Sequence, residues 1–371
     1  MDGATPDPGR DPGPSGRTRA RDEPLAGLWY LAAAAREIRP GRLIRRILFG
    51  EPIALGRTPD GRAFAMLDVC PHRAAPLSGG RIETGARGPC VACPYHGWRF
   101  RIEDGAVDAV PALSAHDAAD PAGIAVKTFT VAETNGLLWI WRAPAGGGAP
   151  AAPPDLGLSA AATPKTVTRV TGRGPYDEAA IGLIDPAHTP FVHKQWWWRQ
   201  GAAAAEKEKR FEPTALGFRM PPHAPSSNSR IYKIFGGAPT TAIEFRLPAL
   251  RIETIRTGNY TVAGVTAMTP GEADETRITH AIFWDAPFLN LATPIVSLMG
   301  RNFLGQDGAI LNAQNLNLAR GDHRPLYLGD PDKPAQWYMK LKQSWTRHIG
   351  ETGTPDGFEN PITPATLRWR T

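Results

Sequence analysis

The sequence predicts a two-domain α+β protein, and three observations lead to this fold class. Up to residue 144, short strand-like runs alternate with turn residues, as in residues 137–141 after the turn pair Asn135-Gly136. Residues 155–371 mix strand-like with helix-like runs, which is typical of an antiparallel sheet flanked by helices. Residues 145–154 between them are rich in Gly, Ala and Pro and suit a linker.

The first domain is expected at residues 25–144 and is expected to be all β. Residues 43–48 and 63–67 are strand-like, and the second of these runs follows the turn residues Asp60 and Gly61. Residues 1–24 are rich in Gly, Pro, Arg and Asp and contain no apolar run. That composition predicts a disordered N-terminal tail and not a signal peptide.

The second domain is expected at residues 155–371. Residues 240–247 and 260–268 are strand-like, whereas residues 176–188 and 303–318 have helical periodicity. Beyond residue 321 the chain is punctuated by prolines and predicts no clear element.

The net charge of +6 raises the question of nucleic-acid binding. The basic residues are scattered, and in the densest run, 206–210, they alternate with Glu206 and Glu208. This pattern is typical of a solvated mixed-charge face, so we expect no nucleic-acid partner. A basic patch that receives an acidic electron-transfer protein also fits the charge.

The number of cysteines and the hydropathy of the chain indicate in which cellular compartment the protein is expected. Three cysteines in 371 residues argue against a disulfide scaffold and fit a reducing compartment, so a cytoplasmic location is expected. No run reaches the roughly 18 apolar residues that a membrane span needs. The nearest candidate, residues 286–300, is interrupted by Asn290 and Pro294.

Two short ligand pairs stand in the first domain. Cys70-x-His72 and Cys93-x-x-His96 each offer one thiolate and one imidazole. Two Cys and two His suit either a structural zinc ion or a Rieske-type [2Fe–2S] cluster. Zinc fingers usually pair Cys with Cys and His with His, whereas mixed pairs let two loops each supply one ligand to each iron. The spacing therefore favours the cluster.

Cys90 forms a second Cys-x-x-Cys pair with Cys93. A redox dithiol is one interpretation. Because Cys93 is better used as a cluster ligand, we expect Cys90 to be a spare thiol in a loop.

The run from residue 185 to residue 193 gathers a carboxylate and two imidazoles. If residues 176–188 form a helix, Asp185 and His188 lie one turn apart, and Pro190 breaks the helix so that His193 can swing round. Two His and one carboxylate on one side of Fe(II) make the facial triad of non-haem iron oxygenases. These residues therefore predict an iron site.

The carboxylate ligand of this site has more than one candidate. Asp185 is one, but Asp307 shares a face of the second predicted helix with Phe303, and a lone Asp on an apolar inward face is costly unless it is paired or metal-bound. We favour Asp307. Asp274 and Asp285 are weaker candidates that are more simply explained as loop or turn residues.

Residues 25–318 resemble the terminal oxygenase, or α subunit, of the Rieske non-haem iron oxygenases. The motifs that carry the resemblance are Cys70-Pro-His72, Cys93-Pro-Tyr-His96-Gly-Trp98, Asp185-Pro-Ala-His188-x4-His193 and Gln306-Asp307. The resemblance implies a helix-grip (START-like) fold for the second domain. It also implies Cys70, His72, Cys93 and His96 as ligands of the cluster and His188, His193 and Asp307 as ligands of a mononuclear iron.

The resemblance further implies that Asp185 bridges an iron-ligand His and a cluster-ligand His of a neighbouring subunit. The length and the lack of a partner-type insertion look most like the α-only homotrimers of the phthalate and vanillate oxygenase kind. Many members carry Asn three residues before the bridging Asp, where this chain has Gly182. That departure removes an amide near the iron and leaves the triad in place.

Electrons must come from elsewhere, because no G-x-G-x-x-G motif follows a strand. NAD(P)H is therefore expected to act through a separate reductase, with a ferredoxin or a fused ferredoxin domain. We hypothesise that electrons pass through His96, Asp185 and His188 to the iron, which uses O2 against the substrate.

Aromatic residues near the iron motif indicate the kind of substrate. They suit either a pocket for a large apolar ring or a core or subunit interface. Lys194 and Arg199 could meet a substrate carboxylate or lie on the surface. The aromatic residues are Phe191, Trp196, Trp197, Trp198, Phe211, Phe283, Trp284 and Phe288.

The sequence thus predicts an oxygenase that hydroxylates or oxidatively demethylates a hydrophobic ring compound. Aromatic dihydroxylation and oxidation of a polycyclic terpenoid or sterol-like substrate stay open. Two rival hypotheses need no oxygen chemistry. One is an electron carrier or ligand-binding protein that lacks the second iron, and the other is a structural zinc module.

Overall fold

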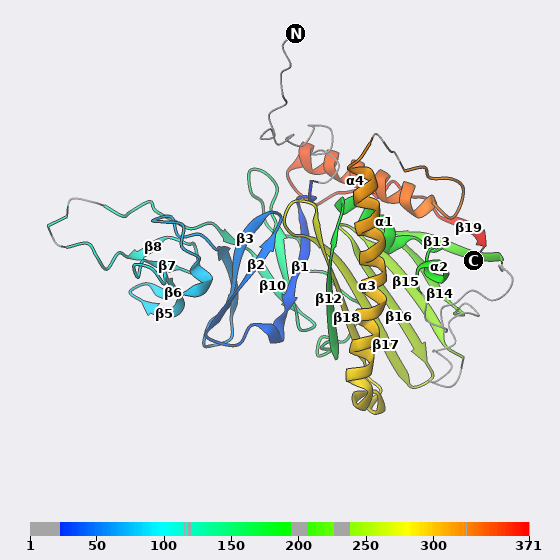
Figure 1. Cartoon of the computed structure of the whole chain (residues 1–371), viewed down its shortest axis with the longest axis horizontal. Coiled ribbons are helices and arrows are strands. Elements are labelled where there is room, and N and C mark those ends of the chain that lie inside the picture. The colour runs from blue at the N-terminus through cyan, green and yellow to red at the C-terminus, as the bar shows by residue number, and fades with distance from the viewer. Residues whose placement is uncertain are drawn as a thin grey trace, which may run out of the picture.

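The computed structural model describes residues 23–114, 116–117, 120–193, 206–225, 238–321, 323 and 325–370. Within these residues the strands form three small sheets and one sheet of eight strands. Figure 1 shows the small sheets at one end of the molecule and the large sheet with its helices at the other. The predicted α+β class is confirmed. The expected disordered tail falls almost wholly outside the described residues.

Two small sheets hold the first half of the chain together. Asn135 and Gly136 have φ values of 50° and 66°, as a two-residue hairpin turn requires, and they join two strands at Thr134 and Leu137. The strands expected at 43–48, 63–67 and 137–141 are confirmed. The sheets are β1-β11-β10 (Leu28–Ala34, Leu137–Arg142, Val131–Thr134) and β2-β3-β4-β9 (Arg42–Leu48, Glu51–Arg57, Ala63–Leu67, Thr128–Phe129).

The third small sheet lies at the far end of the molecule in Figure 1. Phe64, Met66, Leu77 and Phe100 belong to one buried cluster that ties this sheet to β4. Cys90 was expected in a loop, but it lies in an inner strand of this sheet and is fully buried. The strands run in the order β5-β6-β7-β8 (Arg81–Gly85, Gly88–Ala92, Arg99–Arg101, Val107–Ala109).

The large antiparallel sheet forms the second half. The strands expected at 240–247 and 260–268 are confirmed as β15 and β17. The last strand comes from the region beyond residue 321, where no element was expected. The order is β12-β18-β17-β16-β15-β14-β13-β19, with bounds Thr166–Arg173, Glu275–Trp284, Tyr260–Pro270, Leu250–Thr257, Thr240–Arg246, Gly217–His223, Glu206–Thr214 and Ala365–Arg370.

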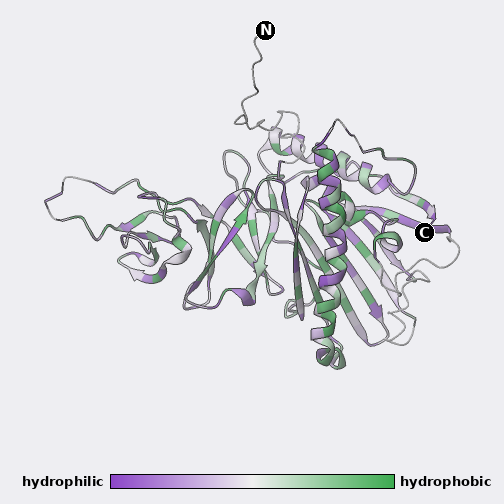
Figure 2. Ribbon diagram, in the orientation of Figure 1, coloured by the Kyte–Doolittle hydropathy of each residue, from purple (hydrophilic) through white to green (hydrophobic). Residues whose placement is uncertain are grey.

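Helix α3 (Thr293–Leu318) runs across one face of this sheet (Figure 1). It begins ten residues before the predicted start. Leu311 packs close to β12, because a Cβ on Gly172 would come within 2.7 Å of its side chain. Hydrophobic and hydrophilic residues are mixed along α3 (Figure 2). Its buried residues, Leu304, Gly308 and Leu311, recur every three to four positions and so lie on one face of the helix.

Two of the remaining helices pack on each other beside the large sheet (Figure 1). Helix α1 (Tyr176–Ile184) packs on α4 (Lys333–Thr352), where the buried Asp177 carboxylate accepts hydrogen bonds from the Tyr338 hydroxyl at 2.7 Å and the Lys342 ammonium at 2.6 Å. The shorter helices are α2 (Thr189–Val192) and the 3-10 turns Ala35–Glu37, Leu77–Gly79 and Pro287–Ala292.

The charged run 206–210 is a solvated mixed-charge face on one side only, where Glu206, Glu208 and Arg210 are exposed. It lies in β13, so its side chains alternate between the two sides of the sheet. Glu206 and Glu208 are exposed, whereas Lys207 and Lys209 are half-buried beside a cavity. In the part of the chain that the structure describes, no helix is long and apolar enough to cross a membrane.

Candidate metal centre

The two predicted cluster loops follow β4 and β6 and close over one another. The Cys70 amide donates to the Ala75 carbonyl at 2.9 Å, and the Cys93 amide donates to the Trp98 carbonyl at 2.8 Å, so each cysteine begins a tight turn. The His72 and His96 rings lie beside one another with centroids 4.7 Å apart, and His72 also stacks on Trp98 at 4.9 Å.

The four side chains are layered in a way that fits a Rieske cluster. Cys70 and Cys93 are buried, whereas His72 is exposed and His96 is half-buried. Burial raises the pKa of the Cys70 thiol, and the Cys93 thiol lies within hydrogen-bonding reach of it. The Nδ1 atom of His96 is buried and has no hydrogen-bond partner in the protein. Two inner thiols and two outer imidazoles are the donor set that one all-sulfur iron and one histidine-ligated iron need.

A carboxylate missed at the sequence level supports these loops. Asp68 is buried and accepts hydrogen bonds from the Ser78 amide at 2.6 Å and the Ser78 hydroxyl at 2.7 Å. Arg45 lies 3.4 Å from the same carboxylate. Asp68 therefore holds the segment after the first ligand pair. A single Asp at the end of a strand does not indicate this role in the sequence.

The second candidate centre joins the two ends of α2, where His188 and His193 lie, to Asp307 of α3. Ligand atoms of His188, His193 and Asp307 all lie within 4.8 Å of one another. The Asp307 Oδ1 atom is 3.4 Å from His193 Nε2 and 3.8 Å from His188 Nε2. The buried His193 Nε2 has no hydrogen-bond partner in the protein, and such an atom fits a metal ligand. Two imidazoles and one carboxylate are the donor set of the facial triad.

Neighbouring residues orient these ligands. His193 stacks on Phe303 with centroids 3.6 Å apart, and its Nδ1 lies 3.2 Å from the Gln306 amide oxygen. His188 Nδ1 lies 2.9 Å from the Asp185 carbonyl oxygen and 3.6 Å from the Asp185 carboxylate. In both imidazoles the Nε2 atom thus faces Asp307, because the other nitrogen is held from behind.

The helix expected at 176–188 is shorter than predicted. It ends at Ile184, because Pro186 restricts Asp185 to an extended backbone with ψ of 119° and cannot donate to the helix. His188 precedes α2, and Pro190 starts that short helix and does not break a longer one. Asp185 and His188 are still neighbours, but through a turn.

Burial sets the protonation of the triad. It lowers the pKa of His193 to about 4, with help from the neighbouring His188, and raises the pKa of Asp307 to about 6. Burial also opposes charge on His188, but the hydrogen bond and charge of Asp185 outweigh it and raise the pKa of His188. At neutral pH, His193 is uncharged and Asp307 is ionised, which are the forms that bind a metal.

The weaker carboxylate candidates lie elsewhere. Asp285 accepts a hydrogen bond from the Thr261 amide at 2.7 Å at the end of a hairpin. Asp274 has a φ of 57° in the turn between β17 and β18. Asp185 points its carboxylate at the Ala187 amide and at His188, so it lies behind the triad.

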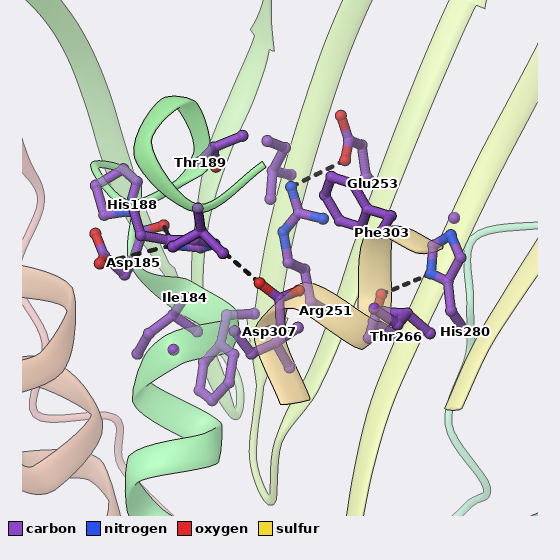
Figure 3. Close-up of a pocket in the computed structure, with 18 of the residues that line it drawn as sticks. Ile184, Asp185, His188, Thr189, Arg251, Glu253, Thr266, His280, Phe303 and Asp307 are labelled. Atoms are coloured by element: carbon purple, nitrogen blue, oxygen red, sulfur yellow. Dashed lines mark hydrogen bonds and ion pairs between the residues drawn. The ribbon is translucent and has the colours of Figure 1, made fainter. Parts of the chain in front are cut away.

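A cavity of about 740 Å³ opens beside the triad, between the large sheet and helices α1 and α3. His188 and Asp307 are on its helical side, and Figure 3 shows Arg251 beside Asp307, with Glu253 and His280 farther from His188. These three polar residues were missed, because alternating residues of a strand do not show which face meets a cavity. Apolar residues from five strands line much of the rest, including Phe218, Phe245, Ile255, Val262 and Ile282.

The predicted aromatic residues do not gather in one place. Phe211 and Trp284 line the cavity, whereas Phe283 packs in the core cluster beneath the first domain. Phe191 and Phe288 are exposed. The predictions made for Lys194, Trp196, Trp197, Trp198 and Arg199 fall outside the described residues.

Comparisons with known proteins agree with the first centre. Residues 28–130 match the family described as the Rieske [2Fe-2S] domain. Over 171 residues, the chain is 38% identical to the oxygenase component of dicamba O-demethylase from Stenotrophomonas maltophilia, covering 45% of this chain and 47% of that protein. It is 39% identical over 117 residues to a toluene-4-sulfonate monooxygenase iron-sulfur subunit from Comamonas testosteroni, covering 32% and 31%. The chain thus spans less than half the length of these relatives.

Solved structures extend the likeness to the whole fold. A crystal structure of dicamba monooxygenase bound to dicamba has a TM-score of 0.64 at 22% identity, covering 88% of this chain and 98% of that one. NdmA from Pseudomonas putida CBB5 with caffeine has a TM-score of 0.65 at 19% identity, covering 90% and 95%. Residues 28–130 thus match the Rieske [2Fe-2S] domain family, and the chain as a whole shares the fold of these two solved proteins.

Proposed function

We propose that this chain is the terminal oxygenase of a multicomponent Rieske system. It would hydroxylate or oxidatively demethylate a hydrophobic ring compound, using O2 and electrons from NAD(P)H that arrive through a reductase or ferredoxin. One observation carries the proposal. The two-histidine, one-carboxylate group of His188, His193 and Asp307 stands at the wall of a 740 Å³ cavity in a chain that also carries a Rieske domain.

In this proposal, His188, His193 and Asp307 hold a mononuclear Fe(II), and Cys70, His72, Cys93 and His96 hold the [2Fe–2S] cluster. When bound, these groups supply oxygen activation and single-electron transfer. The apolar cavity wall excludes water and packs against the substrate ring, which holds the ring close to the triad. Phe303 and Gln306 keep the His193 ring at one angle, so its Nε2 stays aimed at the same point.

The relatives support the reaction type. Their names include an O-demethylase of dicamba and a monooxygenase of toluene-4-sulfonate, and one structural neighbour binds caffeine. Each of these compounds is a ring of moderate size. A cavity of about 740 Å³ has room for one such ring with substituents.

The two centres also lead us to propose a homotrimer. Figure 1 shows the cluster-bearing sheet β5–β8 and the segment α2 beside His188 at opposite ends of the molecule. A path from cluster to iron within one chain would be long, whereas a ring of copies would bring His72 and His96 of one copy to the Asp185 side of the next. In that arrangement Asp185 accepts a hydrogen bond from His96 of the neighbouring copy while it holds His188. We also propose a cytoplasmic location, which three free cysteines support.

Metal content tests the proposal first. Anaerobically purified protein should hold iron and acid-labile sulfide at roughly 3:2, with a Rieske EPR signal after reduction. A ratio near 1:1 that added Fe(II) does not change would favour the electron-carrier hypothesis. Zinc without sulfide would reject both.

Mixing two inactive variants tests the path between copies. An Asp185→Asn chain keeps its cluster, and a Cys93→Ser chain keeps its iron site. If electrons cross between copies, trimers formed by co-expressing the two chains with different affinity tags should turn over with a surrogate reductase, whereas each chain alone stays inactive. No recovery in mixed trimers of verified composition would place the path within one chain. Co-expressed wild-type chains with the same two tags are the control.

A further inference from the structure

The floor of the cavity carries a row of polar side chains across three neighbouring strands. Arg251 of β16 stands opposite Thr266 of β17, and Thr266 stands opposite His280 of β18. All three line the cavity. Glu253, two residues after Arg251 on the same strand, faces the same side. Figure 3 shows this row on the side of the cavity opposite His188 and Asp185.

These side chains are held in place by contacts along the sheet. The Arg251 guanidinium lies 2.9 Å from the Glu253 carboxylate, with side-chain exposures of 27% and 18%. The Thr266 hydroxyl is 2.8 Å from His280 Nδ1. Gly264 leaves room for the imidazole, because a Cβ there would come within 3.0 Å of His280 Cε1. The row is therefore built into the sheet.

Stability alone does not explain such a row. The free energy needed to remove an ion pair and an imidazole from water is about as large as the free energy gained from their mutual attraction. Apolar side chains of similar size would stabilise the fold equally well. Flanking positions in these strands are apolar, for example Ile255 of β16 and Ile282 of β18. A polar group on an apolar cavity floor instead has the character of a recognition element.

The charge of the row is balanced. Arg251 and Glu253 neutralise each other, and burial lowers the pKa of His280 to about 4, so its ring is neutral. The row therefore offers N–H donors from Arg251 beside carboxylate acceptors from Glu253, with no net charge. A carboxylate entering here would give up its water and still lie beside Glu253. A neutral group with one C=O and one N–H would meet both partners without that repulsion.

We propose that Arg251, Glu253 and His280 form a subsite for an uncharged amide-like group, a lactam or carboxamide, on the ring substrate. The C=O accepts from Arg251, and the N–H donates to Glu253. The inference rests on the proposed function, because it assigns one end of the same substrate cavity. Arg251 acts electrostatically on His193 and Asp307, so a ring anchored at this subsite extends toward the triad.

Matched probes test the charge preference. Isothermal titration calorimetry on the iron-loaded holoenzyme at pH 7.5 would compare 2-naphthamide with 2-naphthoate, which share a ring and differ in charge. Wild-type protein should bind the amide at least about tenfold more tightly. Glu253→Gln removes the repulsion but keeps the shape, so the ratio should fall to about one or reverse in favour of 2-naphthoate. Arg251→Met should weaken both probes by about tenfold or more.

Two variants serve as controls. Arg256→Met removes an exposed arginine from the same strand, and Glu244→Gln removes a carboxylate from the neighbouring strand on the other face of the sheet. Neither should change the ratio. Unfolding temperature and iron content check that each variant is intact.

Three results would overturn the inference. They are tighter wild-type binding of 2-naphthoate, an unchanged ratio in Glu253→Gln, and no binding of 2-naphthamide up to its solubility limit. The proposed function fails separately. The proposed function fails if the protein binds no mononuclear iron, and the affinities for the two probes can still be compared in such iron-free protein. If iron and turnover are present but the ratio of the two affinities is unchanged in Glu253→Gln, only the subsite is wrong.

Discussion

Asp307 is the residue on which the proposed iron site depends most, since its carboxylate faces both imidazoles. Asp307→Asn keeps the shape but removes the negative ligand. We expect the mononuclear iron to be lost, so that total iron falls from about three to about two per chain while sulfide and the Rieske spectrum are unchanged. Iron and sulfide analysis measures this. Asp285→Asn is the matched control, and loss of the cluster in Asp307→Asn would contradict the assignment.

The raised pKa of Asp307 gives the metal site a pH dependence. A proton competes with the metal once the pH falls through about 6. Below that pH the affinity of metal-free protein for Co(II) should fall about tenfold per pH unit, or more steeply as His188 also takes a proton. His193 adds nothing until about pH 4. Visible absorption titrations from pH 5 to 8 would show it, and a flat affinity across that range would exclude Asp307 as a ligand.

The same pKa affects the metal-free fold with the opposite sign. Because the folded-state pKa of Asp307 is raised, the proton stabilises the folded chain at low pH, and this contribution is lost as the pH rises through about 6. Metal binding replaces the proton above that pH.

Single residues were easier to predict than their surroundings. Cys70, His72, Cys93 and His96 stand in a spacing that few other sites use, and the fold brings all four to one tip. Arg251 could not be singled out, since nothing in a β-strand says which neighbour lies across the sheet. Its partners, Thr266 and His280, come from strands that only the folded register aligns.

At the scale of elements, the cluster loops depend on how close β6 comes to the turn after Cys70. A Cβ on Gly80 would lie 2.0 Å from the Ala92 carbonyl oxygen, whereas a Cβ on Gly79 would meet only Pro94 at 3.6 Å. Gly80→Ala should push the two loops apart, destabilise the fold by about 1–3 kcal/mol and reduce cluster content. Gly79→Ala should be close to wild type. Sulfide content and thermal unfolding would compare the two variants. If Gly79→Ala and Gly80→Ala lose cluster and stability to the same extent, the loops tolerate a Cβ at Gly80.

Prolines decided where the helical predictions succeeded and failed. The periodicity of residues 176–188 looks helical to its end, but Pro186 ends α1 at Ile184. Helix α3 begins ten residues before its predicted start, and Pro294 occupies the first turn of the helix, where a proline is tolerated. Strands bounded by clear turns, such as β11, were predicted within a residue.

At the scale of the whole molecule, a buried polar cluster fixes α1 against α4. Asp177 has a side-chain exposure of 5%, and its ion pair with Lys342 reaches a residue 165 positions away. Asp177→Ala should destabilise the protein by about 3–5 kcal/mol, because Lys342 loses its buried carboxylate. Thermal or denaturant unfolding measures this. Removing the exposed Glu208–Arg368 pair should leave the unfolding temperature almost unchanged. If both variants behave alike, α4 is held by apolar packing alone.

The distance between the two centres has a consequence for inheritance. If each active site needs the cluster of one copy and the iron of the next, a chain that lacks both centres inactivates two sites of the trimer: its own and the one that its cluster would supply. In a cell that makes intact and defective chains together, activity would follow the square of the intact fraction. A damaged allele would then be partly dominant, and two alleles damaged in different centres would complement each other.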